Sequence, residues 1–277
     1  MTVRPGHIPD WLSCPSSNFT IGEKLGTGGF GTVWAGVRRR DGLKVAIKHV
    51  SRTRVLAWDT CHGTAVPREL TLLLDVQNVP GVVKILEFYE RKDSFIFIME
   101  RPDNVMDLFN FINKEKELSE TLARDFFLQV IDIVIGCSQN NVVHQDIKDE
   151  NLLVNLDTLK LSLIDFGSGD LIRPGYYSEF EGTRVYSPPE WISNRRYKWE
   201  GLTVWSLGIL LYTMLSGDVP WKEDEEIIAA RLEFNPGLSL EIRDLIRGCL
   251  RLDTTQRLTL AGIKTHPWLN TKEIPNR

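Results

Sequence analysis

The chain has 277 residues, of which 42% are hydrophobic, 9% aromatic and 25% charged. This is the composition of an ordinary globular protein, and it excludes a wholly disordered chain and a fibrous repeat protein. Thirty-three lysines and arginines against 37 aspartates and glutamates give a formal net charge of −4. Because no global positive field is available to attract nucleic acid or an anionic membrane, we expect neither as a partner.

The chain shows no targeting or membrane-spanning signal. Its longest apolar stretch, residues 204–215, is too short for a membrane-spanning helix, which needs about 20 apolar residues. The N-terminus lacks the apolar block of a secretory signal, and the four cysteines form no CxxC pair. We therefore expect a cytoplasmic protein without a disulfide framework or a zinc site, leave nuclear access open, and take a monomer as the default.

Strand patterns occupy the first third of the chain. Apolar and β-branched runs predict strands over residues 19–25, 32–37, 43–50, 82–89 and 95–99. The pair Asp41-Gly42 is typical of a hairpin turn. Leucines at helical spacing predict one helix over residues 65–77. Together these patterns indicate a small, five-stranded antiparallel lobe with one main helix.

After Arg101-Pro102 the pattern becomes helical. Ser119 is a typical helix cap, and apolar residues follow it every four positions from Leu122 to Val134. Further helices are predicted over residues 202–216, 224–232 and 240–250. We expect a cleft between the two lobes to be the ligand site. The predicted parts are an N-terminal extension (1–18), a β-rich lobe (19–99), a hinge (100–104), a helix-rich lobe (105–270) and a C-terminal tail (271–277).

A glycine-rich motif, G-x-G-x-x-G-x-V, includes Gly26, Gly28, Gly31 and Val33. It lies between two predicted strands rather than between a strand and a helix, which argues against a dinucleotide-binding fingerprint. A flexible glycine hairpin can instead lay backbone N–H groups over a triphosphate. For this motif taken alone, a plain hairpin turn is the alternative.

Lys48 ends the run V-A-I-K in the third predicted strand. Strand alternation places Lys48 on one face, with Val45 and Ile47 on the other. An amine at this position can neutralise phosphate oxygens if a carboxylate holds it, and Glu69 in the following helix is the natural partner. A surface lysine is the alternative, which the next motif disfavours.

Residues 144–151 read H-Q-D-I-K-D-E-N, and D-F-G follows at residues 165–167. These spacings resemble the protein kinase signature, H-R-D-x-K-x-x-N followed by D-F-G. The resemblance implies an α+β, bilobal eukaryotic protein kinase fold with a larger, mainly helical second lobe. It also implies ATP and Mg²⁺ as cofactors, since phosphoryl transfer depends mainly on positioning and charge neutralisation.

The resemblance assigns a role to each residue of these motifs. Asp146 would orient the acceptor hydroxyl and take its proton, while Lys148 would steady the γ-phosphate. Asn151 and Asp165 would hold Mg²⁺, whose preference for oxygen ligands suits both side chains. A lysine at position 148 is the form typical of serine/threonine kinases. His144 is expected to pack and to bond the backbone rather than to act as a base.

Two later segments complete the resemblance. Residues 187–190, S-P-P-E, correspond to the A-P-E element of kinases. We expect Glu190 to form an ion pair with Arg257 as a structural anchor, without a catalytic role. Thr183 matches the threonine that bonds the catalytic loop in serine/threonine kinases.

Longer stretches, including residues 100–102, 165–169, 182–191 and 204–212, resemble the Pim family of serine/threonine protein kinases. The likeness spans roughly residues 19–270. Pro102 lacks the N–H that most kinase hinges offer to adenine, so adenine would keep the Glu100 carbonyl and rely on apolar contacts. Met99 occupies the gatekeeper position. The residues predicted to bind the nucleotide are Leu25, Gly26, Gly28, Gly31, Val33, Ala46, Lys48, Met99, Glu100 and Leu153.

Gln145 departs from the family, which has an arginine at this position. That arginine normally docks a phosphate or acidic residues of the activation segment, residues 165–190 here, and a neutral glutamine cannot form the bidentate ion pair. We expect activity without phosphorylation of this segment, with Glu179 and Glu181 as fixed acceptors. The alternative is a pseudokinase-like scaffold that binds nucleotide with weak or no transfer.

Substrate preference follows from charge. The residues predicted to meet a peptide are Asp107, Glu150, Thr183, Asp218 and Asp224, with Asp149 and the acidic run 223–226 beside them. Carboxylates there would attract arginine- and lysine-rich segments N-terminal to the acceptor serine or threonine; a solvated acidic face is the alternative. The sequence thus predicts a serine/threonine kinase acting on basic protein segments. A small-molecule phosphotransferase is less favoured, because residues 182–190 resemble a peptide-docking element.

Overall fold

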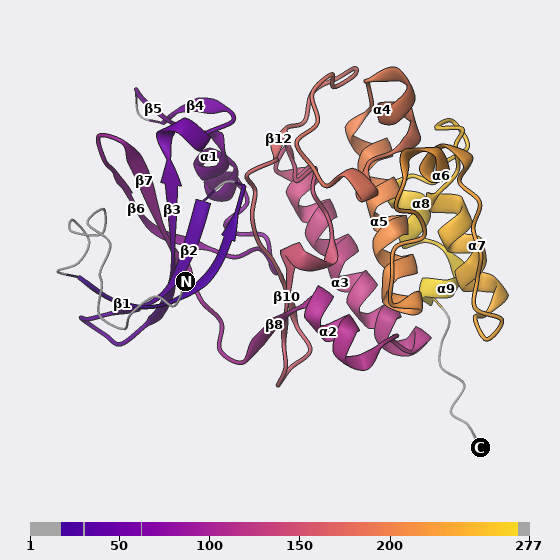
Figure 1. Ribbon diagram of the computed structural model, residues 1–277, viewed down its shortest axis with the longest axis horizontal. Coiled ribbons are helices and arrows are strands. Elements are labelled where there is room, and N and C mark those ends of the chain that lie inside the picture. The colour runs from indigo at the N-terminus through magenta and orange to yellow at the C-terminus, as the bar shows by residue number, and fades with distance from the viewer. Residues whose placement is uncertain (1–17, 30, 62, 271–277) are drawn as a thin grey trace. The chain divides into compact units, whose positions relative to one another are not determined.

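The computed structural model describes residues 18–270 apart from residues 30 and 62, and these form two compact units (Figure 1). The first unit contains the described residues up to Gln77 together with Val83–Asp103. The second contains Asn78–Val82 and the described residues from Asn104 onward. Residues 1–17 of the predicted extension (1–18) and the whole predicted tail (271–277) lie outside the described residues.

The first unit is built on a five-stranded antiparallel sheet with the strand order β1-β2-β3-β7-β6. The strands are β1 (Phe19–Gly28), β2 (Gly31–Arg38), β3 (Lys44–Ser51), β6 (Ile85–Glu90) and β7 (Ser94–Glu100). Helix α1 (Arg68–Asp75) follows a two-stranded hairpin of β4 (Trp58–Cys61) and β5 (Thr64–Pro67), and the short 3₁₀ helix η3 (Arg52–Arg54) precedes that hairpin. The five predicted strands are confirmed. The predicted helix 65–77 is confirmed over Arg68–Asp75, since residues 65–67 belong to β5.

One face of this sheet carries an apolar core. Phe19, Val45, Ile47, Ile96 and Ile98 are all buried on it and pack together. Since side chains alternate across a strand, this packing commits the neighbouring positions of β3 and β7 to the opposite face. The sequence pattern therefore predicted correctly which face of β3 is apolar.

The fourth strand begins later than the sequence predicts. Instead of joining β6, Val82 pairs with Leu163, whose backbone N–H donates to the carbonyl of Gly81 at 2.7 Å. Gly81 has a φ of 85°, and a Cβ there would lie 2.6 Å from the side chain of Ile133. Only a glycine fits this turn. Residues 78–82 therefore pack within the second unit, and β6 starts only after the chain has returned to the first.

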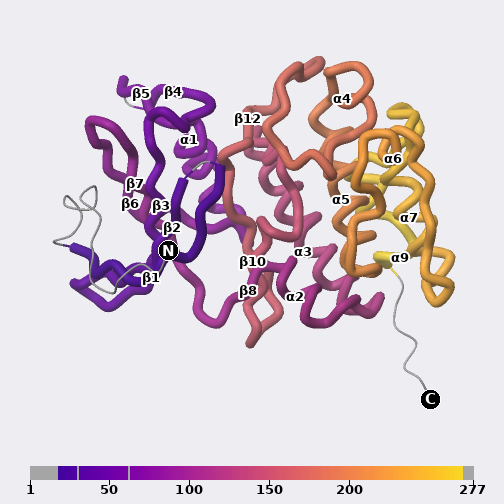
Figure 2. Tube along the Cα trace, in the orientation of Figure 1, coloured from indigo at the N-terminus to yellow at the C-terminus, as the bar shows by residue number. Residues whose placement is uncertain are grey.

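The second unit is mainly helical, and its chain path is shown in Figure 2. Its helices are α2 (Leu108–Glu115), α3 (Glu120–Gln139), α4 (Pro189–Asn194), α5 (Trp199–Ser216), α6 (Asp224–Ala229), α7 (Leu240–Cys249), α8 (Leu260–Lys264) and α9 (Pro267–Asn270). The predicted helices are confirmed with shifted ends, and Ser119 caps α3 by accepting from the backbone N–H of Leu122 at 3.3 Å. Within residues 18–270, no helix of the structure is both long and apolar enough to cross a bilayer.

Short strands and 3₁₀ helices flank the loops of the second unit. Strands β8 (Val105–Asp107), β10 (Leu152–Asn155) and β11 (Leu161–Leu163) form one small sheet, and β9 (Val142–Val143) pairs with β12 (Asp170–Leu171). The 3₁₀ helices are η4 (Asp149–Asn151) and η5 (Arg184–Tyr186). The loop from His144 to Lys148 therefore runs between β9 and η4, held at both ends by regular structure.

Candidate active site

In the first unit, Lys48 and Glu69 form an ion pair in which the two side chains are only 5% and 6% exposed. Lys48 lies on β3 opposite Phe97 of β7, on the face that the apolar core leaves free. Glu69 lies in the first turn of α1. A buried ammonium stays charged only when a carboxylate compensates for its lost hydration, so the pair holds a fixed positive group on this face. The predicted pairing is confirmed.

The strand register gathers several predicted nucleotide contacts on the same face as Lys48. Val33 is paired with Lys48, while Ala46 is paired with Met99. Val33 and Ala46 are half-buried, and Leu25 is 45% exposed beside an irregularity in the β1–β2 ladder. The carboxylate of Glu100 accepts from the backbone N–H of Lys84 at 3.1 Å. Leu153, also half-buried, belongs to β10 of the second unit.

The glycine-rich motif forms the end of the β1–β2 hairpin, as predicted. Gly26, Gly28 and Gly29 have open space where a Cβ would be. Gly31 lies so close to β3 that a Cβ would come within 2.3 Å of the His49 carbonyl oxygen. Glycine at position 31 is thus required by packing, whereas the other three glycines meet no neighbouring atom where a side chain would begin. Residue 30 of the motif lies outside the described residues.

In the second unit, the carboxylate of Asp146 is bound on both oxygens. The backbone N–H of Thr183 donates to Oδ1 at 2.7 Å, and Nδ2 of Asn151 donates to Oδ2 at 2.9 Å. Nζ of Lys148 lies 3.4 Å from Oδ2. Asp146 is only 8% exposed, so these donors replace water around its charge. The carboxylate is held in one orientation, as a base that must meet an incoming hydroxyl requires.

Asn151 and Asp165 provide oxygen ligands suited to Mg²⁺. Nδ2 of Asn151 donates to the backbone carbonyl and to Oδ2 of Asp146, so Oδ1 is the atom that would bind a metal ion. Asp165 has a φ of 63°, and its Oδ1 accepts from the backbone N–H of Gly167 at 3.3 Å. In the part of the chain that the structure describes, no group of three or more His, Cys, Asp or Glu could hold a metal unaided. Asn151 and Asp165 would therefore hold a Mg²⁺ ion together with phosphate oxygens of a bound nucleotide.

His144 joins these two loops through its ring. Nε2 lies 3.0 Å from the carbonyl of Ile164, so it donates, and Nδ1 accepts from the backbone N–H of Asp146 at 3.2 Å. The ring packs edge-on against Phe166. Burial lowers the pKa of His144, with the bonds to its neighbours opposing that shift. A neutral imidazole with both nitrogens used by the backbone confirms the predicted packing role.

Lys148 links the catalytic loop to the activation segment. Its Nζ donates to Oγ1 of Thr183 at 2.8 Å and forms an ion pair with Glu150 at 2.7 Å. Burial would lower the pKa of Lys148, but the bond to Glu150 and the charge of Asp146 outweigh it, so the pKa is raised. Lys148 therefore carries a firm positive charge beside Asp146, and the predicted bond from Thr183 to the catalytic loop is confirmed.

Gln145 bonds differently from the expectation. Within the described residues, neither carboxylate of Glu179 and Glu181 contacts it; the hydroxyl of Tyr197 donates to its Oε1 at 2.9 Å instead. The same hydroxyl lies 2.7 Å from the carbonyl oxygen of Glu179. Glu179 and Glu181 accept hydrogen bonds through their main-chain carbonyls, the Glu181 carbonyl from Ser168 Oγ at 2.9 Å. A role for their carboxylates as acceptors stays a prediction.

The carboxylates predicted to meet a peptide each have a partner within the second unit. Asp107 caps α2 by accepting from the backbone N–H of Asn110 at 2.8 Å, and Glu150 pairs with Lys148. Asp218 pairs with Lys222 at 2.5 Å. Asp224 pairs with Arg184, and both side chains of that pair are exposed. A basic peptide would therefore compete with these internal cations, and the peptide contacts stay a prediction.

Three of the acidic residues placed beside them have structural roles. Asp149 is 5% exposed and accepts from the hydroxyl of Tyr186 at 3.1 Å, so it is not a surface carboxylate. Burial raises its pKa, although the Tyr186 hydroxyl opposes the shift. Glu223 and Glu226 form a capping box at the start of α6. The charge pattern alone could not separate these residues from solvated ones.

The Glu190–Arg257 ion pair is confirmed as a buried anchor. Two parallel bonds join the guanidinium to the carboxylate, at 2.7 and 2.9 Å. The guanidinium also donates to the carbonyls of Gly201 and Arg251 and lies 4.9 Å from the centre of the Trp205 ring. The pair holds the start of α4 against α5, far along the chain from the catalytic residues.

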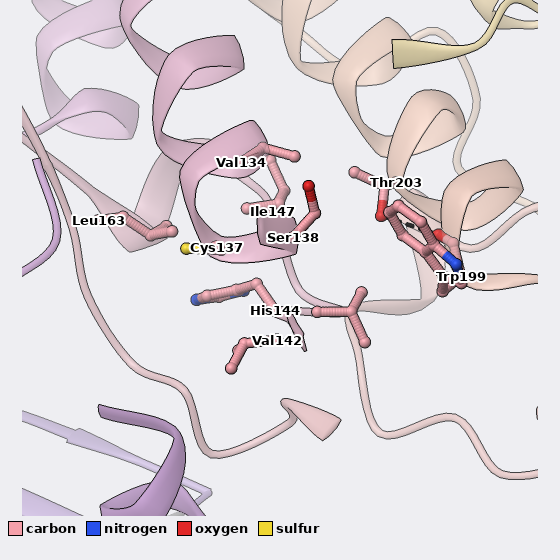
Figure 3. A pocket seen from close by; sticks show the side chains of 10 residues that line it. Val134, Cys137, Ser138, Val142, His144, Ile147, Leu163, Trp199 and Thr203 are labelled. Atoms are coloured by element: carbon pink, nitrogen blue, oxygen red, sulfur yellow. Dashed lines mark hydrogen bonds between the residues drawn. The ribbon is translucent and has the colours of Figure 1, made fainter. Parts of the chain in front are cut away.

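A small cavity lies behind the catalytic loop (Figure 3). Its lining includes His144, Cys137, Ser138, Trp199 and Thr203, and its volume is about 10 Å³. This volume is at the lower limit for a single water molecule. The hydroxyls of Ser138 and Thr203 already donate to backbone carbonyls at 2.8 Å. The cavity is therefore a packing space and not a substrate site.

Sequence reasoning missed two residues that hold the activation segment. Tyr197 has no motif around it, and only its place in the folded chain brings its hydroxyl to Gln145. Gly182 lies where a Cβ would come within 2.5 Å of the Gln145 carbonyl oxygen. The glycine was visible in the sequence, but its close approach to the catalytic loop has no local signal.

Comparison with known proteins places the chain among kinases. Residues 19–269 match the protein kinase domain. The chain is 43% identical over 268 residues to serine/threonine-protein kinase pim-2 of Danio rerio, covering 93% of this chain and 86% of that protein. It is 40% identical over 261 residues to serine/threonine-protein kinase prk-2 of Caenorhabditis elegans, covering 93% and 59%. It is 31% identical over 258 residues to NUAK family SNF1-like kinase 1 of Mus musculus, covering 91% and 38%.

Proposed function

Because the chain belongs to the protein kinase family, and within it to the Pim serine/threonine kinases, we propose that it transfers the γ-phosphoryl group of ATP to serine or threonine in basic segments of protein substrates. The observation that carries the proposal is the arrangement around Asp146. Its carboxylate is fixed by Thr183 and Asn151, with the ammonium of Lys148 3.4 Å away. A fixed base beside a fixed cation is what transfer to a hydroxyl requires.

Each remaining group has a defined task in this proposal. Lys48, held by Glu69, would neutralise phosphate oxygens of the nucleotide. Asn151 and Asp165 would hold Mg²⁺, which supplies charge neutralisation on the phosphates. Lys148 would stabilise charge on the transferred group, and Asp146 would orient the acceptor hydroxyl and take its proton. The proposal needs no further cofactor.

Basic substrates are proposed from the carboxylates of the second unit. Glu150 and Asp218 pair with lysines, and Asp224 pairs with Arg184. The Asp218 and Asp224 pairs are exposed, and exposed ion pairs contribute only about 0–1 kcal/mol, so arginines of a substrate can replace the internal cations at little cost. The geometry thus supports a peptide site whose carboxylates accept cations. In the structure these carboxylates are paired with lysines and an arginine of the chain itself.

We also propose that phosphorylation of the activation segment is not needed. Gln145 is buried and neutral, and it is bonded to Tyr197 rather than open to an incoming phosphate. Treating the purified protein with a phosphatase should leave its activity unchanged. A large gain on phosphorylating Ser178 or Thr183 would refute this part of the proposal. A cytoplasmic location and a monomeric state stay predictions of the sequence.

The experiment that tests the function uses radiolabelled ATP, Mg²⁺ and a serine peptide with arginines N-terminal to the serine. We expect label in the peptide, a lower rate when alanines replace the arginines, and a loss of 10²- to 10⁴-fold in the Asp146→Asn variant. Nucleotide binding without labelled peptide would instead indicate the pseudokinase-like scaffold. Label only in small acceptors such as sugars would indicate a small-molecule phosphotransferase.

A further inference from the structure

The hydroxyl of Tyr197 lies at a junction between the catalytic loop and the activation segment. It is 2.9 Å from Oε1 of Gln145, the neighbour of Asp146, and 2.7 Å from the carbonyl oxygen of Glu179. A hydroxyl has one proton to donate, so it serves one of these acceptors at a time. If the Gln145 amide presents its N–H₂ group instead, both contacts form together. In both arrangements the hydroxyl lies within hydrogen-bond distance of both loops.

The ring of Tyr197 is fixed by its surroundings. It is fully buried and stacks on Tyr177, with the ring centres 5.4 Å apart and the planes 15° from parallel. The backbones of the two tyrosines also exchange hydrogen bonds, at 2.8 and 3.1 Å. Phe180 and Trp191 pack edge-on or nearly so around the same ring. Because the ring is closely packed, its hydroxyl has a fixed position. The hydrogen bonds to this hydroxyl therefore hold Gln145 and Glu179 in place.

Two further contacts continue the junction along the activation segment. Gly182 packs directly on the carbonyl of Gln145, where a Cβ would come within 2.5 Å of the oxygen. The next residue, Thr183, donates its backbone N–H to Oδ1 of Asp146 at 2.7 Å. The segment is thus joined to two consecutive catalytic-loop residues, with Tyr197 fixing the first and Thr183 fixing the second.

The junction is neutral. Gln145 is 7% exposed, and among the described residues its side chain contacts no carboxylate. Burial raises the pKa of Tyr197, so its hydroxyl stays protonated. A guanidinium at position 145 would need an anion to compensate for its burial, as a phosphate on the segment would supply. Gln145 and Tyr197 need no such anion.

From these contacts we propose that Tyr197 is a positioning residue that orients Asp146 by joining Gln145 to the activation segment, in place of an arginine–phosphate pair. The proposal rests on the proposed kinase function and assigns the regulation of the same site. Tyr197 touches neither substrate nor nucleotide in this role. Its effect reaches the reaction through the orientation of the Asp146 carboxylate.

The test compares Tyr197→Phe with Tyr177→Phe. Both substitutions keep the stacked rings and remove one buried hydroxyl. Among the described residues, however, the Tyr177 hydroxyl bonds only within the activation segment, to the Leu171 carbonyl and the Arg173 N–H. We expect Tyr197→Phe to lower kcat about tenfold with KM for ATP unchanged, and Tyr177→Phe to change kcat less than twofold. A purely structural role would lower the melting temperature of both variants alike and leave kcat of the folded fraction unchanged.

A double-mutant cycle with Gln145→Ala sharpens the test. If the two side chains act together, the double variant should lose no more activity than the Gln145→Ala single variant. Additive losses, or an unchanged kcat in Tyr197→Phe, would overturn the proposal while the wild-type activity upholds the kinase function. Hydrogen exchange gives a readout without activity: the amide of Thr183 should exchange at least tenfold faster in Tyr197→Phe than in Tyr177→Phe. Equal exchange would also overturn the proposal, even if the wild type proved inactive.

Discussion

The buried ion pair of Glu190 and Arg257 allows a quantitative prediction, because nearly every donor of the guanidinium is used. Breaking a buried pair costs about 3–5 kcal/mol, since it leaves one charge uncompensated. In Glu190→Ala, the guanidinium keeps the carbonyls of Gly201 and Arg251 as acceptors. We therefore expect a loss near the lower end, about 3 kcal/mol in the free energy of unfolding.

Two further variants separate charge from shape. Glu190→Gln keeps an acceptor for one of the two bonds but removes the charge, so we expect a loss of about 2 kcal/mol. Replacing Glu190 by Leu and Arg257 by Met together removes both charges, and apolar packing against Trp205 should then restore more than half of the loss seen in Glu190→Ala. Both expectations depend on the pair being buried, with the Arg257 side chain 1% exposed.

Urea unfolding followed by tryptophan fluorescence measures these differences, and a thermal melt should show Glu190→Ala shifted down by roughly 6–12 °C. Activity per folded molecule, measured well below the melting temperature, should stay within about threefold of wild type. A loss below about 1 kcal/mol would show that the pair is not the anchor we describe. A hundredfold fall in kcat of fully folded Glu190→Gln would show that the pair acts in catalysis.

Three more predictions follow from single sites. Pro102→Ala adds a hinge N–H and should tighten ATP binding severalfold, measured by calorimetry, because one hydrogen bond is worth about 0.5–1.5 kcal/mol; unchanged affinity would contradict the proposed hinge register. Glu120→Gln should lower the free energy of unfolding by about 1–2 kcal/mol in urea, because its carboxylate accepts from Ser239 and the Trp268 indole. His144 has a pKa lowered by burial from its usual 6.5, so the unfolded chain alone gains its proton as the pH falls below 6.5. Stability should then fall by up to about 1.4 kcal/mol per pH unit, and His144→Gln should remove this part of the pH dependence; an identical slope in both proteins would count against it.

The catalytic groups were predictable because their signals are local. Lys48 follows from strand alternation, whereas Asp146, Asn151 and Asp165 follow from the resemblance of two short loops to the protein kinase signature. The helix α5 follows from its apolar run. In the strand and the helix, the spacing of neighbouring residues determines which way a side chain points. In the two loops, the short motifs carry the resemblance that assigns each residue its role.

Other features depend on contacts between distant segments and left no local pattern. The hairpin of β4 and β5 has four-residue strands without clear alternation, so it was not predicted. The crossing at Gly81 depends on the side chain of Ile133, about fifty residues away along the chain. The internal partners of Asp149 and Asp224 likewise come from 37 and 40 residues away. Charge patterning therefore could not show which acidic residues already have a partner within the chain.

At Gln145, a change that is visible in the local sequence combines with a contact from a distant segment of the chain. The substitution of a glutamine for an arginine was visible in the sequence, and from the loss of charge we predict an activation segment that needs no phosphate. What replaces the charge was not visible, because Tyr197 lies 52 residues away and contributes only a hydroxyl. A neutral residue in the catalytic loop would weaken the enzyme if its amide were left unbonded in the interior. Since the amide is bonded and the segment is packed onto it at Gly182, the same substitution is compatible with an ordered active site, which favours transfer over the scaffold alternative.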